Sequence, residues 1–121
     1  MLGWKVFNSG LPGPLQSSIC KDTEASISAA GTTQGTATEL KAADNEITTV
    51  ASGAGCVLSS AIASGDTQTV FNAGANAVKI YPPSGMQINA LAANLPMTLG
   101  INTGVMFKCI SSTRIFAILS A

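Results

Sequence analysis

The sequence contains no histidine, and only 6 basic and 6 acidic residues are found among its 121 positions. The missing imidazole removes the commonest general base, the usual partner of a nucleophilic serine or cysteine, and the commonest nitrogen ligand of transition metals. The only close carboxylate pair in an otherwise strand-like context, Asp44 and Glu46, lies beside alanine and asparagine in what we interpret as a solvated turn. We therefore expect no catalytic residue, no cofactor and no metal ligand, and we predict that the chain is not an enzyme.

Charge of either sign is scarce. Charged residues make up 10% of the chain, against about 25% in ordinary soluble proteins. The basic residues are scattered singly and the formal net charge is zero, so the clustered lysine and arginine that bind phosphate are missing and we expect neither nucleic acid nor a membrane as a partner. A surface this poor in charge is easily desolvated and suits permanent contact with another protein. A monomer with a polar, uncharged coat is the alternative.

The three cysteines, Cys20, Cys56 and Cys109, form no Cys-x-x-Cys pair, so the spacing of zinc and redox sites is missing. Their odd number argues against a disulfide framework. Cys56 and Cys109 each lie in an apolar run, where we expect the thiol to pack as a small hydrophobe.

Long apolar runs and phosphate-binding glycine motifs are also missing from the sequence. A membrane span needs about 20 consecutive apolar residues, and a signal peptide needs a basic region followed by an apolar one. The chain has neither pattern, nor a Gly-x-Gly-x-x-Gly or phosphate loop. We therefore expect a protein made in a cytosol, with no small-molecule substrate.

What is present begins with a segment, residues 1–22, that differs in composition from the rest. It holds the only tryptophan, Trp4, together with Phe7, Leu11 and Leu15, and two prolines flanking a glycine forbid a helix there. Burying Trp4 and Phe7 would remove on the order of 300–500 Å² from water, so we predict an extended arm that docks on its own domain or on a neighbouring subunit. Because aromatic anchors usually carry binding energy, we predict that these four side chains form a partner interface.

Residues 23–121 show short β-prone runs separated by small-residue turns, which is typical of a sandwich or barrel. Apolar repeats at helical spacing are interrupted by Gly, Thr and Pro. We predict one all-β domain with strands at residues 24–29, 35–40, 46–50, 55–59, 67–71, 77–82, 86–91, 96–99, 104–110 and 114–119.

Two local features refine this prediction. Residues 72–76, Asn-Ala-Gly-Ala-Asn, lie between two β-prone runs and have the composition of a hairpin loop. Residues 115–119, Ile-Phe-Ala-Ile-Leu, are continuously apolar, so we expect both faces of the last strand to be covered.

Several stretches of the sequence carry a resemblance to a known group of proteins. They are GTTQGTATEL (31–40), VASGAGCVL (50–58), VFNAGANAVKIYP (70–82), GMQINALA (85–92) and FKCIS (107–111). These stretches resemble a small β-structured domain that recurs in virion proteins of tailed bacteriophages, and the resemblance spans residues 29–121. It implies a jelly-roll-like β-barrel or sandwich in a structural protein of the virion, while the arm lies outside it.

On that resemblance we expect a capsid cement (decoration) protein that oligomerises and stabilises the shell. The implied partners are the major capsid protein and further copies of the chain, as a homotrimer, within a virion assembled in the host cytoplasm. The alternative is a structural protein of the tail fibre, baseplate or head-to-tail adaptor. A third hypothesis is a carbohydrate-binding receptor module, for which Tyr81 is the candidate aromatic platform.

Overall fold

The computed structural model describes residues 22–120, and this part of the chain forms β-strands and no helix. The strands are β1 (Thr23–Ser28), β2 (Thr38–Glu39), β3 (Asp44–Thr49), β4 (Gly55–Val57), β5 (Thr67–Asn72), β6 (Val78–Tyr81), β7 (Gln87–Ile88), β8 (Met97–Leu99), β9 (Thr103–Cys109) and β10 (Arg114–Leu119). Each of these strands overlaps one of the predicted runs. The all-β class is therefore confirmed.

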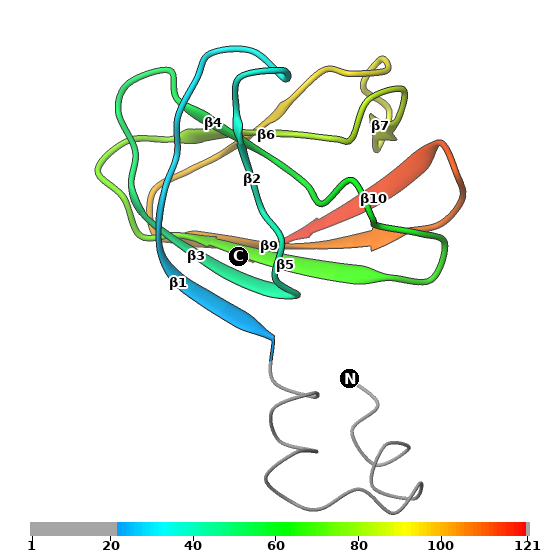
Figure 1. The fold of residues 1–121 in the computed structure, drawn as a ribbon, viewed down its shortest axis with the longest axis horizontal. Coiled ribbons are helices and arrows are strands. Elements are labelled where there is room, and N and C mark those ends of the chain that lie inside the picture. The colour runs from blue at the N-terminus through cyan, green and yellow to red at the C-terminus, as the bar shows by residue number, and fades with distance from the viewer. Residues whose placement is uncertain (1–21, 121) are drawn as a thin grey trace, which may run out of the picture.

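The first six strands alternate between two sheets that pack face to face (Figure 1). The six-stranded sheet has the order β1-β3-β5-β9-β10-β7, and the four-stranded sheet has the order β2-β4-β6-β8. Within them β1, β3 and β5 run parallel, as do β2, β4 and β6. Each odd and even pair is therefore one coil of a short β-solenoid, and the coils stack side by side.

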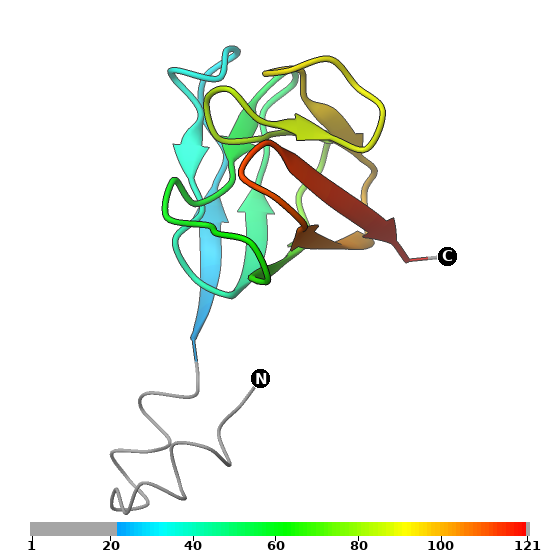
Figure 2. The same cartoon turned by 90° about the vertical axis from the view of Figure 1, so that its right-hand side faces the viewer.

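The C-terminal part of the chain closes the last coil with antiparallel strands. β9 pairs with β5, and β8 pairs with β6, in antiparallel register. β10 folds back on β9 as a hairpin, and its first residues also pair with β7 (Figure 2). The third coil thus has strand neighbours on both of its sides, which satisfies the backbone groups of β5 and β6.

The jelly-roll barrel that the resemblance implies is wrong in its strand topology, because jelly rolls are built from antiparallel strands. The predicted hairpin at residues 72–76 is wrong for a related reason. β5 and β6, which flank that loop, lie in different sheets, so the loop is a corner between the two layers. The same turn-forming residue types occur in hairpin loops within one sheet and in corners between two sheets. Composition alone therefore does not distinguish a hairpin from a corner of the solenoid.

The core lies between the two sheets and follows the alternation of the strands. In β9, Val105, Phe107 and Cys109 are buried while Met106 and Lys108 are exposed, as a half-buried strand requires. The largest fully buried side chains come from both sheets and from the corners between them: Phe107, Leu40, Ile47, Leu58, Ile80, Ile88, Leu99 and Ile115. The outward-facing side of each sheet is therefore left for solvent or for a partner.

Buried amides at the corners hold successive coils together. Gln68 Nε2 donates to the carbonyls of Leu40 (2.6 Å) and Ala42 (3.0 Å), and Gln68 Oε1 accepts from the amide of Ser59 (3.1 Å). One side chain thereby joins the corner after β2 to the corner after β4. Such bonds satisfy backbone groups that a change of sheet leaves without a ladder partner.

Candidate functional site

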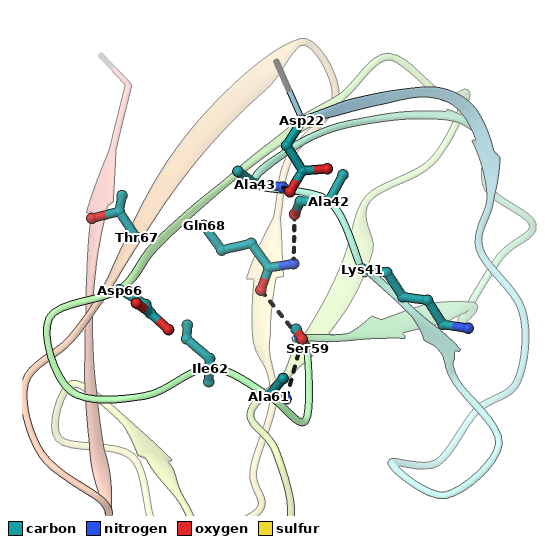
Figure 3. A pocket seen from close by; sticks show the side chains of 10 residues that line it. All are labelled: Asp22, Lys41, Ala42, Ala43, Ser59, Ala61, Ile62, Asp66, Thr67 and Gln68. Atoms are coloured by element: carbon teal, nitrogen blue, oxygen red, sulfur yellow. Dashed lines mark hydrogen bonds between the residues drawn. The ribbon is translucent and has the colours of Figure 1, made fainter. Parts of the chain in front are cut away.

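A solvent-open pocket of about 280 Å³ lies along one side of the solenoid, where the corners after β2 and β4 meet (Figure 3). It is lined by Asp22, Lys41, Ala42, Ala43, Ser59, Ala61, Ile62, Asp66, Thr67 and Gln68. The pocket contains two carboxylates, Asp22 and Asp66, so it is a candidate site for acid–base chemistry.

The polar side chains of this pocket are bonded to the backbone of the turns that form it. Asp22 Oδ2 accepts from the Ala43 amide at 3.0 Å, and Asp66 Oδ2 accepts from the Ala63 amide at 2.9 Å. Gln68 joins Ala42 and Ser59 across the pocket floor, as Figure 3 shows. We interpret the pocket as a braced corner, because Asp22 and Asp66 each accept a bond from a turn amide, and Ser59 Oγ likewise accepts from the Ala61 amide at 3.2 Å.

The pair Asp44 and Glu46 lies on β3 rather than in a solvated turn, so that interpretation of the sequence is wrong. The two side chains share the outer face of the six-stranded sheet, because Asn45 between them and Ile47 after them are buried. Asp44 is level with Thr69 on the neighbouring strand β5. Both carboxylates therefore belong to the outward-facing surface of the sheet.

The same outer face becomes apolar beyond β5. Phe71 on β5, Met106 on β9, and Phe116 and Ile118 on β10 are exposed by 39%, 41%, 43% and 58%, respectively. We call these four side chains the apolar face. Phe71, Met106 and Phe116 point away from the core, since they alternate with buried residues along their strands, and Ile118 is on the same side of β10 as Phe116.

The pairing register makes the apolar face continuous. Met106 lies directly opposite Ile118, and Phe116 and Phe71 are its diagonal neighbours, within reach of long side chains. Phe71 is opposite Gly104, where a Cβ atom would lie 3.5 Å from the Phe71 ring. The Phe71 ring therefore packs beside a position without a side chain.

The expectation that both faces of the last strand are covered is wrong for the residues described. The inner face of β10 is buried at Ile115, whereas Phe116 and Ile118 on its outer face are open. β10 also pairs with β7 only through Arg114 and Ile115. The continuous apolar run at residues 115–119 thus includes side chains on an outer face that the rest of residues 22–120 does not bury.

Cys56 and Cys109 are both buried free thiols, which confirms their predicted role as small hydrophobic side chains. Burial raises the pKa of the Cys56 thiol to about 12. Burial also raises the pKa of Cys109, and the nearby carboxylate of Asp66 adds to the effect. Neither thiol is poised to act as a nucleophile, because the reactive form is the thiolate.

We expect Cys56 and Cys109 to resist alkylation in the folded protein at pH 8 and to react rapidly after denaturation. Iodoacetamide labelling followed by peptide mass mapping measures this, and a Cys20→Ser variant removes the remaining thiol. Modification of Cys56 in the native protein at the rate of a free thiol would contradict its assigned burial.

Glu39 has a lowered pKa, first because the backbone amide of Ser60 bonds to its carboxylate and second because the Ser60 hydroxyl does. Both bonds are 3.0 Å long, and Lys41 contributes a smaller attraction. A carboxyl group with a lower pKa in the folded state stabilises the fold above its unfolded pKa and loses that contribution as the pH falls.

We therefore expect the melting temperature of a Glu39→Gln variant to fall less steeply than that of the wild type below about pH 4.5. Thermal denaturation between pH 7 and pH 3 measures the difference, with Glu24→Gln as the control. Identical slopes for the two variants would show that the Ser60 bonds do not couple to protonation of Glu39.

The predicted interface residues Trp4, Phe7, Leu11 and Leu15 lie outside the residues that the structure describes, so they stay a prediction. Tyr81 is described, and it is buried, with its hydroxyl donating to the Thr32 carbonyl at 3.0 Å. A buried ring offers no platform for a sugar. Sequence reasoning missed the apolar face itself, although the alternation of exposed and buried positions around Met106 was a usable signal.

Within residues 22–120, histidine, cysteine and carboxylate side chains form no group of three or more that could hold a metal ion. This part of the chain also contains no helix that is long and apolar enough to cross a membrane. Comparison of the chain with protein-family models, with curated proteins and with solved structures gave no match. The apolar face is therefore the main indication of function in residues 22–120.

Proposed function

We propose that the chain is a structural subunit that works by packing against other protein chains. The observation that carries this proposal is the apolar face on β5, β9 and β10, which residues 22–120 leave open to solvent. Contiguous apolar patches on a folded surface commonly mark interaction sites. Only 10% of the chain is charged, so little electrostatic self-repulsion opposes close contact.

We further propose that these contacts are made in the virion of a tailed bacteriophage, as a capsid cement protein. The sequence stretches at 31–40, 50–58 and 70–82 support this role through their resemblance to virion proteins. The partners would be the major capsid protein and two further copies of the chain, since closed cyclic symmetry is the usual way in which identical small subunits bury a shared surface.

A tail fibre, baseplate or adaptor protein is the second candidate, and the parallel coils favour it. β1 and β2 are edge strands of the two sheets at the same end of the solenoid, where another strand could continue the stack. However, β1 contains register shifts, and Ser26 has a φ of 62°. An irregular edge of this kind protects a sheet against strand addition, which favours the cement role over fibre stacking.

Quantifying the copy number of the chain in purified particles separates these roles. A cement protein is present in hundreds of copies, and a tail or adaptor protein in tens. Shells depleted of the chain should rebind it and become more resistant to heat. A purified chain that neither binds shells nor is found in particles would contradict the virion role.

A further inference from the structure

The apolar face lacks an occupant among residues 22–120, and its size restricts what the occupant can be. At roughly 200 Å² for a large apolar residue, the exposed fractions of its four side chains leave roughly 350 Å² open to water. A stable interface between two folded subunits buries about 800 Å² on each partner. Two apolar faces pressed together fall well short of that area.

A short segment with two aromatic anchors matches the face better. Residues 1–15 contain Trp4 and Phe7, which need to bury on the order of 300–500 Å². The only charged residue in this segment is Lys5. Glu46 is level with Phe71 in the register, so the rim of the face offers a carboxylate to a lysine beside the tryptophan.

We propose that the apolar face of one copy receives residues 1–15 of a second copy, so that subunits are joined by exchange of their N-terminal arms. This inference rests on the proposed function, in which copies of the chain assemble, and it names the contact that joins them. The arm and the face are different surfaces, so the contact is heterologous, and such contacts close into a ring where the rotation between copies closes. A ring of three copies is the expected assembly.

The direction of the chain at Asp22 favours a neighbour over the subunit's own face. The Asp44 amide donates to the Asp22 carbonyl at 2.9 Å, and the Ala43 amide donates to Asp22 Oδ2 at 3.0 Å. These bonds hold the chain beside β3 up to Asp22, at the end of the sheet from which β1 begins. An arm that continues in this direction leaves its own sheet.

The register places the own face to the side of the line along which the chain leaves β1. Thr23 is level with Asp44, which is level with Thr69, and Thr69 is level with Met106. The nearest member of the apolar face, on β5, is thus two strands away from β1, and Phe116, slightly ahead of the start of β1, is four strands away on β10. The turn-forming Pro-Gly-Pro at residues 12–14 comes eight residues before Asp22, up to about 26 Å away along an extended chain, a distance at which a neighbouring subunit can be met.

Mixing two full-length variants tests the exchange. The arm variant, Trp4→Ala/Phe7→Ala, keeps the face and contains no tryptophan. The face variant, Met106→Lys/Ile118→Asp, keeps Trp4, and its opposite charges face each other across β9 and β10, which preserves strand pairing. The matched control is Thr98→Asp, which places the same kind of pair opposite Lys79 on the four-stranded sheet.

We expect the wild type and the Thr98→Asp control to be oligomers whose mass is a multiple of the 12.2 kDa of one chain. Their Trp4 emission should be shifted to the blue and should shift back to the red on dilution. Each double variant alone should be monomeric, with self-association weakened at least about tenfold. When the two are mixed, a complex should form and the Trp4 emission of the face variant should shift to the blue. Circular dichroism verifies that both variants are folded.

Two results would overturn the proposal. One is a monomeric wild type whose blue-shifted emission does not change on dilution, which would place the arm on its own subunit. The other is a mixture of folded variants that forms no complex. Shell binding is measured separately, so the chain could fail this test and still prove to be a virion protein, and the reverse also holds.

Discussion

Replacing Asn72 with alanine is expected to destabilise the protein by roughly 2–4 kcal/mol, because several buried backbone groups lose their partner together. The Asn72 side chain is fully buried at the corner after β5. Its Nδ2 donates to the carbonyls of Asn76 (3.0 Å), Leu99 (3.1 Å) and Gly100 (3.3 Å), and its Oδ1 accepts from Gly74 (2.9 Å). Since small domains are stable by only about 5–15 kcal/mol, urea denaturation will detect the loss.

An isosteric variant separates these hydrogen bonds from simple packing. Asn72→Asp keeps the shape of the side chain and the acceptor for the Gly74 amide. It replaces the amide donor by a carboxylate oxygen that faces three carbonyls. We therefore expect the loss of stability at neutral pH to be at least as large as for the alanine variant. Asn76→Ala is the control, because the exposed Asn76 side chain makes only one bond of this kind, to the Val50 carbonyl at 2.8 Å. Wild-type stability of Asn72→Asp would contradict the assigned bonding.

Deleting residues 1–15 is expected to leave a folded domain that no longer attaches to its partner. The core between the two sheets is built from residues 27–115, so the melting temperature should change little. Each aromatic anchor that is lost typically costs about 2 kcal/mol or more of binding free energy, which predicts at least about 100-fold weaker attachment for Trp4 and Phe7 together.

Sedimentation velocity over a range of concentrations measures this loss, because the proposed partner of the arm is a second copy of the chain. The matched controls are Trp4→Ala/Phe7→Ala, which should reproduce the deletion, and Asn8→Ala/Ser9→Ala, which should not. Attachment of the truncated chain with unchanged affinity would show that Trp4, Phe7, Leu11 and Leu15 do not form the interface.

The corner pocket and the apolar face meet different physical requirements. The corner pocket is polar, and its carboxylates and Gln68 are bonded to the backbone, so it contributes to stability. The polar neighbours of the apolar face, Glu46 and Lys108, lie at its rim, and the face gains free energy from any apolar occupant through loss of hydrated surface. This contrast favours a role in assembly over one in chemistry.

The positions of the strands and the burial of Cys56 and Cys109 could be determined from the sequence by itself. Alternation at Val105 to Cys109 and the apolar context of Cys56 are local signals, because neighbouring side chains on a strand point to opposite faces whatever the strand pairs with. The absence of histidine and the scarcity of charge are also properties of the sequence alone.

Only the tertiary structure decided which strands are neighbours. Whether the chain at residues 72–76 turns back within one sheet or crosses to the other depends on contacts with Leu99 and Gly100, far along the chain, and no local pattern contains them. The same holds for the outer face of β10: an apolar run signals burial, but the sheet order determines that Phe116 and Ile118 lie on a side that residues 22–120 leave uncovered. Local stereochemistry sets the strands, while the pairing of residues distant in sequence sets the solenoid and the surface it presents.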